Sequence, residues 1–523
     1  MKAIKIITIN LMMSALVSAY GYAADTHLEI FPEQQKQQVK FGADIKLTIK
    51  NVAEGNTSKV MDRFIEMGMD MVRLPFFPIR DVTDPFYDKV FKVSDIAEDK
   101  GLILFVSVAN GDGDKNNWLH GAHKFSDKLI CQSNCPKTFY NINLAAYAEY
   151  MDAFLDQMAL HDAKVTFVGP FNEDRGAVSD YQQIWQHMRN SDFKRIGPEL
   201  WGLGNSIIDT PKLLDLVDVV GSHFYDDSAN KVAIHDSQWA ALTEAANGKE
   251  VWFTEATRFE ASNNDMTNLR TGLEHIIPSI RGGAERVIFY QAANRFVWYN
   301  GGARAYRFSG VKQFTKNAIG NVVDSTSDDY AVKTVSFYES GVLKVNITNG
   351  ESTPKITSVK LKGNFAALGS GSQMLWTNDV EAGLTDIAFD DSSCWTMTVP
   401  ANSYLQLSVP VVALSASTIE ECSHIGLPQD SDLPDFDQDG IADFIDEDDD
   451  NDSVLDELDE FPFDATRSGT QVEETEETEE TEETEETVSE EVEAPLTEQK
   501  SSGGSFSGTW AFLMLLLVRR FIK

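Results

Sequence analysis

Two short stretches of this sequence carry most of the information about its architecture. Residues 165–173 read VTFVGPFNE, and residues 251–255 read VWFTE. In each stretch an apolar run with the length and composition of a buried strand ends directly in a glutamate or an Asn-Glu pair. We therefore expect two buried parallel strands, with Glu173 and Glu255 standing where those strands end.

The segment around these stretches, residues 24–318, alternates apolar runs with longer segments of helical period. Eight such units in roughly 295 residues predict an α/β fold, the (β/α)8 TIM barrel. A doubly wound parallel sheet is the alternative, but no glycine-rich phosphate loop follows the first strand. The expected strands are residues 40–45, 69–74, 102–108, 165–170, 200–204, 217–222, 251–254 and 286–290. The expected helices include residues 57–67, 144–160 and 268–280.

Residues 319–415 follow a different pattern. Short stretches such as residues 332–337 and 404–409 are separated by turns rich in Asn, Gly, Ser and Asp. Their spacing and period predict an antiparallel β-sandwich. We expect this sandwich to brace the barrel, with independent sugar binding as the alternative.

The first 23 residues are typical of a secretory signal peptide. Lys2 and Lys5 precede an apolar run over residues 6–17, and small residues lead to a cleavage site near Ala23 or Ala24. A buried helix is the alternative. Export would place the chain in a compartment where disulfides form.

The four cysteines fall into two local sets. Three pairings are formally possible, and we favour Cys131 with Cys135 and Cys394 with Cys422, because each pair lies within or beside one expected domain. A zinc site is the less favoured hypothesis, since a CxxxC motif without a nearby second pair or histidine ligands lacks the usual spacing.

Residues 416–466 carry closely spaced carboxylates, with Gly440 where a loop must turn sharply. Acids at every second position, followed by acids three and six residues later, can surround a hard, oxygen-seeking cation. The spacing resembles that of thrombospondin type 3-like calcium repeats, which implies bound Ca²⁺; a solvated acidic run is the alternative. The expected metal ligands are Asp435, Asp437, Asp439, Asp443, Asp446, Asp448, Asp450, Asp452 and Asp456.

Most of the negative charge belongs to this part of the chain. The formal net charge is −38, and 31 of the 82 acidic residues lie between Asp430 and Lys500. The rest of the chain has no basic stripe that could neutralise phosphates, so we expect no nucleic-acid partner. Residues 467–502 contain Glu-Glu-Thr repeats, which repel one another and predict an extended, disordered spacer.

The C-terminal segment, residues 503–523, joins two glycines to a short apolar run and a basic end. The apolar run covers residues 506–518, which is short of the ~20 residues that span a bilayer comfortably. The segment resembles the GlyGly-type C-terminal sorting tails of Gram-negative bacteria, which implies removal by an intramembrane protease. A plain hydrophobic anchor is the alternative, and in either case we expect a secreted or cell-surface protein of the Gram-negative envelope.

Four further residues stand where expected barrel strands end. Arg73 lies at the end of the second strand, His223 and Tyr225 follow the sixth, and Trp298 follows the eighth. The active sites of such barrels lie at these ends.

With Asn172 and Glu173 on the fourth strand and Glu255 on the seventh, this order resembles that of the retaining glycoside hydrolases of clan A, most closely family 30. The resemblance covers residues 25–412 and implies a barrel followed by a sandwich, with no cofactor for catalysis. It implies that Glu173 acts as general acid and then as general base, and that Glu255 is the nucleophile. Asn172 would hold the 2-hydroxyl of the sugar.

The same resemblance suggests roles for the other candidates. Arg73 would pair with the nucleophile, and His223 and Tyr225 would touch the same carboxylate. Trp298, and Trp118 from the loop after the third strand, would contact sugar rings with their flat faces. The alternatives are structural ion pairs for the glutamates and Arg73, a core histidine at His223, and plain packing for the two tryptophans.

The resulting hypothesis is a secreted or surface retaining endo-β-glycoside hydrolase that cleaves a polysaccharide of β-glucan or xylan type by double displacement. An algal galactan hydrolase of the β-agarase or porphyranase type is an alternative with the same chemistry. A non-catalytic carbohydrate-binding surface protein, or an adhesin whose barrel is incidental to its acidic stalk, is an alternative of another class. We expect a monomer.

Chelation by EDTA is expected to leave hydrolysis of xylan or β-glucan largely unchanged, because the catalytic centre shows no metal-binding motif. The same treatment should strip Ca²⁺ from residues 416–466 and loosen them. Hydrolysis rates with and without EDTA, together with calcium binding by the full chain, check both statements. Loss of all activity in EDTA, restored by zinc, would contradict the assignment.

Overall fold

The computed structural model describes residues 24–77, 81–109, 144–173, 176–225, 235–260, 262–389 and 393–414, together with residues 451, 465 and 466. For residues 123–125, 128–131 and 423–425 it describes the backbone only. The signal peptide, the spacer and the C-terminal tail lie outside the described residues and stay predictions. So do the predicted roles of Trp118, Cys131, Cys135, Cys422 and the nine aspartates between Asp435 and Asp456. Among the described residues, no helix is both long and apolar enough to cross a bilayer.

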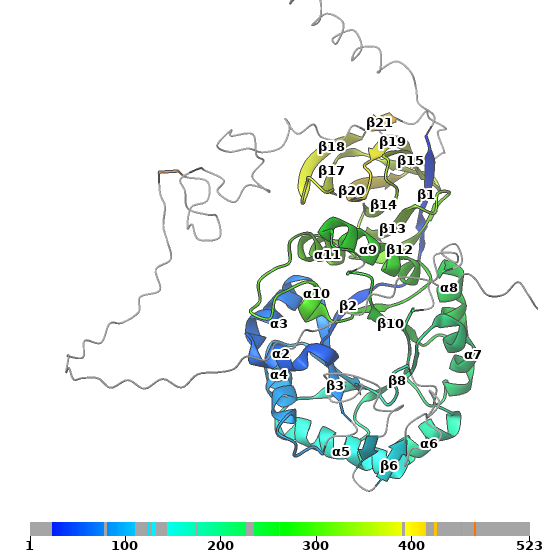
Figure 1. Cartoon of the computed structure of the whole chain (residues 1–523). Coiled ribbons are helices and arrows are strands. Elements are labelled where there is room, and N and C mark those ends of the chain that lie inside the picture. The colour runs from blue at the N-terminus through cyan, green and yellow to red at the C-terminus, as the bar shows by residue number, and fades with distance from the viewer. Residues whose placement is uncertain are drawn as a thin grey trace, which may run out of the picture. The chain divides into compact units, whose positions relative to one another are not determined.

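Eight parallel strands close into a barrel, as the sequence predicts (Figure 1). The last barrel strand, β11, pairs with the first barrel strand, β2, which completes the ring. Helices lie on the outside of the ring (Figure 1), which is the arrangement of a (β/α)8 barrel. The strands are β2 (Lys40–Asp44), β3 (Met69–Phe76), β4 (Ile103–Val108), β7 (Val165–Gly169), β8 (Lys194–Leu200), β9 (Val219–Ser222), β10 (Glu250–Ala256) and β11 (Arg286–Phe289).

The helix ends follow ordinary capping chemistry. Asn56 caps α3 (Thr57–Glu66) by accepting a hydrogen bond from the backbone N–H of Lys59, and Asn264 caps α9 (Asp265–Arg281) in the same way. The predicted helix 144–160 is α5 (Leu144–Leu160). The other helices are α2 (Ile49–Glu54), α4 (Tyr87–Asp99), α6 (Val178–His187), α7 (Leu203–Leu213), α8 (His235–Ala245), α10 (Ala292–Arg295) and α11 (Ala305–Asn317). A 3-10 turn, η2 (Lys46–Thr48), precedes α2, and the strands β5 (His123–Phe125) and β6 (Lys128–Cys131) form a hairpin outside the barrel.

The inside of the barrel is filled with side chains. Phe105, Phe167 and Trp252 belong to one buried cluster, and the rings of Phe167 and Trp252 have centroids 4.7 Å apart. The guanidinium group of Arg73 lies over the ring of Phe105, 5.1 Å from its centroid. This packed layer excludes water and forms an apolar floor beneath the polar groups at the carboxyl ends of the strands.

The fifth barrel strand was predicted wrongly. The prediction was residues 200–204, whereas β8 ends at Leu200 and α7 begins at Leu203. The true strand contains two basic residues and Pro198, and proline is rare in a strand that pairs on both sides. The β8–β9 pairing shifts register between Pro198 and Leu200, so Glu199 stands at an irregularity of the strand.

The predicted antiparallel sandwich is a single 11-stranded sheet, because hydrogen bonds join all its strands. This sheet curls around its own apolar core, which includes Val345, Ile347, Leu405 and Leu407. The sheet consists of β1 (Thr26–Gln35), β12 (Asn321–Ser327), β13 (Val332–Glu339), β14 (Val342–Asn349), β15 (Lys355–Leu361), β16 (Phe365–Ala367), β17 (Gly369–Trp376), β18 (Gly383–Phe389), β19 (Cys394–Val399), β20 (Ser403–Ala413) and β21 (Ser423–Ile425).

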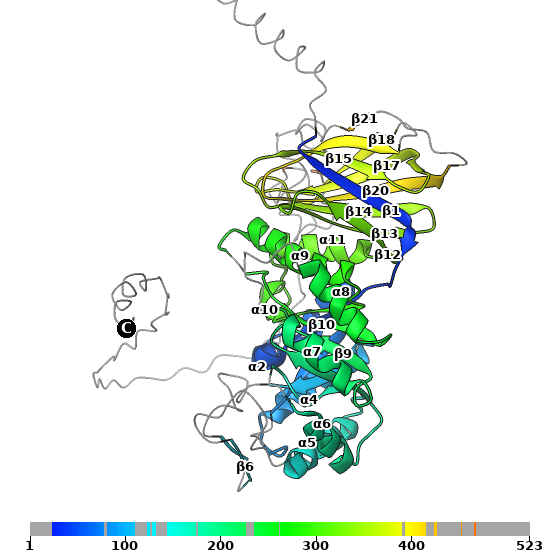
Figure 2. The same ribbon diagram turned by 90° about the vertical axis from the view of Figure 1, so that its right-hand side faces the viewer.

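Strand β1 belongs to this sheet, although residues 24–318 were expected to form the barrel. It pairs antiparallel with β12 and parallel with β15. Leu28 and Ile30 are fully buried, and the alternating burial along β1 is typical of a strand with one buried face. The sheet therefore takes strands from both sides of the barrel sequence. Helix α9 packs against β12, β13, β14 and β20 (Figure 2), and Arg270 donates a hydrogen bond of 2.8 Å to Asn402.

Replacing Trp252 by Ala should lower the free energy of unfolding by about 3–5 kcal/mol, because Trp252 is 1% exposed and fills the barrel interior. Ile208→Ala is the control: Ile208 is 57% exposed, and its change should stay below about 0.5 kcal/mol. Urea unfolding followed by circular dichroism measures both. Equal effects of the two substitutions would show that the barrel interior is not packed in this way.

Candidate active site

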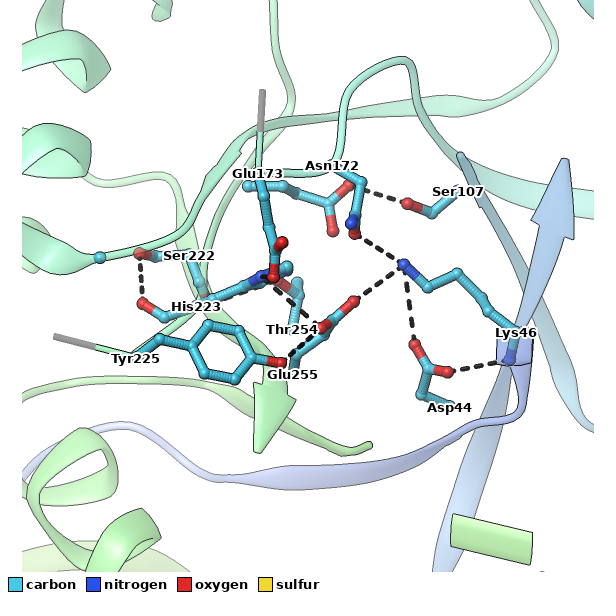
Figure 3. A network of polar contacts seen from close by, with 12 residues as sticks. Asp44, Lys46, Ser107, Asn172, Glu173, Ser222, His223, Tyr225, Thr254 and Glu255 are labelled. Carbon is cyan, nitrogen blue, oxygen red and sulfur yellow. Dashed lines mark hydrogen bonds and ion pairs between the residues drawn. The ribbon is translucent and has the colours of Figure 1, made fainter. Parts of the chain in front are cut away.

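The two predicted catalytic glutamates face one another in the barrel mouth (Figure 3). Glu255 lies in β10, one residue before its end, and Glu173 follows the end of β7. One carboxylate oxygen from each glutamate and a ring nitrogen of His223 all lie within 4.8 Å of one another. Two strands far apart in the sequence thus bring two carboxyl groups to one place.

A left-handed backbone conformation directs Glu173 into the mouth. Its φ is +66°, which is uncommon for a residue with a side chain. Its N–H donates a hydrogen bond of 2.8 Å to the carbonyl oxygen of Glu199 at the end of β8. This bond to the neighbouring strand holds the unusual turn in place.

Glu255 is 3% exposed and is surrounded by donors. Its Oε1 accepts hydrogen bonds from Arg73 Nη1 at 2.6 Å and from Lys46 Nζ at 2.8 Å, and its Oε2 accepts one from the Tyr225 hydroxyl at 2.8 Å. Lys46 and Tyr225 approach from opposite sides (Figure 3). Burial by itself would raise the pKa of Glu255, but electrostatic interactions with His223, Lys46 and Arg73 outweigh burial and hold the pKa well below its usual value. Glu255 is therefore a carboxylate at neutral pH.

His223 lies between the two glutamates. Its Nδ1 is 3.1 Å from Glu173 Oε1 and 3.7 Å from Glu255 Oε2, and the side chain is fully buried. The imidazole therefore fixes the spacing between the two carboxyl groups and contacts both of them. The shorter contact is with Glu173.

The amide of Asn172 has a fixed orientation. Its Oδ1 accepts hydrogen bonds from Lys46 Nζ at 2.6 Å and from Arg73 Nη2 at 2.9 Å. Because the oxygen is engaged by two cations, the NH₂ group is left to face the cavity that Asn172 lines. A donor in this position, close to Glu255, is suited to hold an acceptor oxygen of a ligand.

Among the residues that the structure describes, three buried charged residues of the site were not predicted from the sequence: Asp44, Lys46 and Glu199. Asp44 accepts a hydrogen bond of 3.0 Å from Arg73 and one of 2.9 Å from the backbone N–H of Lys46. Burial raises the pKa of Asp44, although Lys46 and Arg73 oppose this. Asp44 is the last residue of the first barrel strand and Lys46 follows it closely, so the rule that found Arg73 could also have found them. Glu199 was hidden because strand five was misplaced.

A cavity of about 440 Å³ opens over the two carboxyl groups. Trp201 and Tyr225 both line it, and their rings stack with centroids 4.3 Å apart. Trp298 does not line the cavity: it is 51% exposed, and the guanidinium group of Arg304 lies 3.5 Å from its ring centroid. Among the described residues, the aromatic side chains that line the cavity are the predicted Tyr225 together with Trp201 and Tyr290, which were not predicted.

Glu173, His223 and Glu255 have ligand atoms close enough together to hold a metal ion. The cations Arg73 and Lys46 already lie against Glu255 Oε1, which disfavours a third positive charge at that carboxylate. The arrangement is better suited to another chemistry. An ionised carboxylate, Glu255, stands beside a second carboxyl group, Glu173, and both line the cavity.

No protein-family model matches this sequence, and no curated protein matches it. Solved structures share its fold. A family 30 endoxylanase from Clostridium papyrosolvens superimposes with a TM-score of 0.53 at 18% identity, covering 73% of this chain and 100% of its own. A family 30 subfamily 8 xylanase from Clostridium acetobutylicum gives 0.52 at 16% identity, with 73% and 99% coverage. A conserved exported protein from Bacteroides fragilis gives 0.54 at 12% identity, with 74% and 100% coverage.

Replacing Glu255 by Gln should remove part of the acid sensitivity of the folded protein. The pKa of Glu255 lies below its usual value of 4.5 in the folded state, so the unfolded chain takes up this proton first as the pH falls. The stability that this carboxylate contributes is complete above about pH 5 and is lost as the pH falls toward the folded pKa. The free energy of unfolding of the wild type should therefore fall more steeply than that of E255Q, by up to ~1.4 kcal/mol per pH unit.

Urea unfolding between about pH 5.5 and pH 3 measures these slopes. Glu339→Gln is the control, because Glu339 is exposed and lies in the sheet; it should keep the slope of the wild type. Identical slopes for the wild type and E255Q would mean that the folded state does not favour the ionised form of Glu255.

Proposed function

We propose that this chain is a retaining β-glycoside hydrolase that cleaves a polysaccharide of xylan or β-glucan type by double displacement. The observation that carries the proposal is the pair of Glu173 and Glu255, with carboxylate oxygens within 4.8 Å of one another at the mouth of a parallel barrel. One carboxylate is buried and held ionised by cations. The other is half-buried and contacts a histidine.

In the first step the protonated Glu173 gives its proton to the glycosidic oxygen. Glu255 attacks the anomeric carbon, the bond to the leaving sugar breaks, and an ester bond to Glu255 forms. Positive charge develops on the sugar ring in the transition state, and the nearby carboxylate of Glu255 stabilises it. The NH₂ group of Asn172 is available to the sugar hydroxyl next to the anomeric carbon.

In the second step Glu173, now a carboxylate, takes a proton from a water molecule. The water oxygen bonds to the anomeric carbon and Glu255 leaves as a carboxylate. Each step inverts the anomeric carbon, so the product keeps the configuration of the substrate. Glu173 thus donates a proton in the first step and removes one from water in the second. His223, which lies beside Glu173, is placed to assist both proton transfers.

The distance between the carboxyl groups favours retention over inversion. Retaining enzymes hold them about 5–5.5 Å apart, whereas inverting enzymes need roughly 6.5–9.5 Å to place a water molecule between sugar and base. One oxygen of each glutamate lies within 4.8 Å of an oxygen of the other, which is shorter than the separation that inverting enzymes need. The stereochemistry is therefore proposed from geometry alone.

The substrate class is proposed from the cavity and the neighbouring structures. The stacked Trp201 and Tyr225 offer a flat aromatic surface, which suits the apolar faces of sugar rings. The two Clostridium proteins with this fold are named as xylanases, which makes xylan the first substrate to test. The alternatives are cleavage of a β-linked algal galactan and binding of a polysaccharide without cleavage. Assays on a panel of polysaccharides distinguish them.

The rest of the chain suggests where the enzyme works. We propose a secreted or surface-displayed monomer of the Gram-negative envelope, because residues 1–23 are typical of a signal peptide and residues 503–523 of a sorting tail. An intramembrane protease would process the tail, and the acidic repeats of residues 416–466 would bind Ca²⁺. The enzyme would then act outside the cell on a polymer that is too large to be imported.

Purified protein should release reducing ends from xylan or a β-glucan, and the newly formed ends should first appear as the β-anomer by ¹H NMR. Glu255→Gln should lower kcat by about 10³-fold or more, because the nucleophile is lost while the fold is kept. Glu173→Gln should lower kcat on the polysaccharide by about 10²- to 10⁴-fold, since the leaving oxygen is no longer protonated.

A panel of xylans, β-glucans and algal galactans identifies the sugar, and Glu339→Gln serves as the control that should keep wild-type activity. Product length separates endo from exo action. Binding of a polysaccharide that is never cleaved, and that E255Q leaves unchanged, would replace the hydrolase with a carbohydrate-binding protein. Initial release of the α-anomer would contradict the retaining mechanism.

A further inference from the structure

We propose that Glu199 is a positioning residue: it holds Arg73 in place and supplies the negative charge that the site needs when Glu255 becomes an ester. The inference rests on the proposed function, because it concerns the covalent step. Glu199 is fully buried at the end of β8 and does not line the cavity. It therefore acts through Arg73 and not on the sugar.

Arg73 joins the two sides of the site. Its Nη1 donates to Glu255 Oε1 at 2.6 Å, and its Nη2 donates to Glu199 Oε1 at 2.5 Å. The same Nη2 donates to Asn172 Oδ1 at 2.9 Å and to Ser107 Oγ at 2.9 Å. Because a guanidinium group is planar and rigid, a carboxylate that fixes one nitrogen also fixes the direction of the other. Together with Asp44, which accepts from Nη1 at 3.0 Å, Glu199 thus determines where Arg73 meets both Glu255 and Asn172.

The backbone around Glu199 is shaped to deliver this carboxylate. Glu199 has a φ of +51°, a conformation that disfavours residues with a side chain, and it lies where β8 shifts register against β9. Such strained positions occur where a particular side-chain direction is needed. A regular strand would alternate its side chains and would not place Glu199 on Arg73 in this way.

Two glycines on the flanking strands make room for the side chain. A Cβ atom at Gly169 on β7 would lie 2.1 Å from Glu199 Oε2, and one at Gly221 on β9 would lie 3.0 Å from Glu199 Cγ. Any other residue at position 169 would displace the carboxylate. Residues from three adjacent strands therefore fit together around one buried negative charge.

The charges explain why a carboxylate stands there. Before the reaction, Arg73 and Lys46 face the carboxylates of Glu255, Asp44 and Glu199. When Glu255 forms an ester with the sugar, it loses its negative charge, whereas Arg73 and Lys46 keep their positive charges. Without Glu199 these two buried cations would then face Asp44 alone, and an unbalanced buried charge is costly. Glu199 therefore stabilises the glycosyl-enzyme and the transition state leading to it.

The prediction concerns one step of the reaction. Formation of the glycosyl-enzyme neutralises Glu255 and should be slowed when Glu199 is neutral. Hydrolysis of the glycosyl-enzyme restores the charge of Glu255 and should not be slowed. A merely structural role for Glu199 would instead change the amount of active protein, and not the ratio of these two steps.

The test uses the full chain and a dinitrophenyl β-xylobioside, whose good leaving group makes the first step fast. The wild type should give a burst of dinitrophenolate followed by slow turnover. E199Q keeps the size of the side chain and an oxygen that can accept from Arg73, and it should lower the burst rate constant by about tenfold or more. Ser107→Ala removes a neutral partner of Arg73 Nη2 and the 3.3 Å hydrogen bond that Ser107 Oγ donates to Glu199 Oε2, but it leaves the charges of Arg73 and Glu199 in place and should have a smaller effect.

Gly169→Ala examines the same contact from the neighbouring strand. Made alone, Gly169→Ala should lower the burst rate constant, because the new methyl group displaces the carboxylate of Glu199. Added to the Glu199→Ala variant, it should have little further effect. Gly204→Ala is the matched control, since a Cβ at Gly204 meets nothing within 4 Å. The same double-mutant cycle measured by urea unfolding needs no substrate, and it should show that Gly169→Ala is costly only when Glu199 is present.

The outcomes separate the two proposals. A wild-type burst with an unchanged burst rate constant in E199Q overturns the positioning role and leaves the hydrolase intact. A lower burst amplitude with an unchanged rate constant shows a structural role only. No turnover of any polysaccharide or aryl glycoside by the wild type overturns the proposed function, and the unfolding cycle then still decides whether Gly169 makes room for Glu199. Additive effects of Gly169→Ala and Glu199→Ala in that cycle would overturn the contact itself.

Discussion

The ion pair between Arg73 and Glu255 is the interaction on which the whole site depends. Removing a carboxylate from water costs several kcal/mol, and the cost is recovered only with close and well-oriented partners. Glu255 has such partners in Arg73 at 2.6 Å and Lys46 at 2.8 Å. The same two cations also hold the oxygen of Asn172. These two cations, together with His223, thus keep the nucleophile ionised, and their bonds to the Asn172 oxygen turn its amide toward the cavity.

The closed barrel is what makes these short distances possible. Several strands contribute site side chains at their carboxyl ends, and the ring of hydrogen bonds fixes where every barrel strand ends. The apolar interior around Trp252 supports the charged groups from below and keeps water away from them. Pairwise attractions in such a dry site are stronger than in water, so small displacements of Arg73 have large effects. This is why glycine is needed at position 169, next to the carboxylate that holds Arg73.

Much of the site could be predicted because its residues follow apolar runs. Glu173 and Glu255 come directly after strands that are easily recognised, and the structure brings these two residues together. Trp201 and Glu199 were missed for one reason: Glu199 lies in β8 and Trp201 directly follows it, and this strand contains Pro198 and two basic residues and therefore does not look like a buried strand. Pairing with β7 and β9 on both sides stabilises β8 in spite of its composition. Tertiary context outweighed local propensity at this strand.

The sequence by itself determined the barrel, its trailing sheet and the two glutamates, because apolar periodicity and strand order are local properties of the chain. Only the tertiary structure decided that β1 belongs to the sheet and that Trp201, and not Trp298, lines the cavity. It alone also decided that Lys46 contacts Asn172, a partner of Arg73, and that Glu199 contacts Arg73 itself. These are contacts between segments up to hundreds of residues apart. Such contacts depend on how strand ends, register shifts and side-chain directions combine in space, and no short stretch of sequence contains that information.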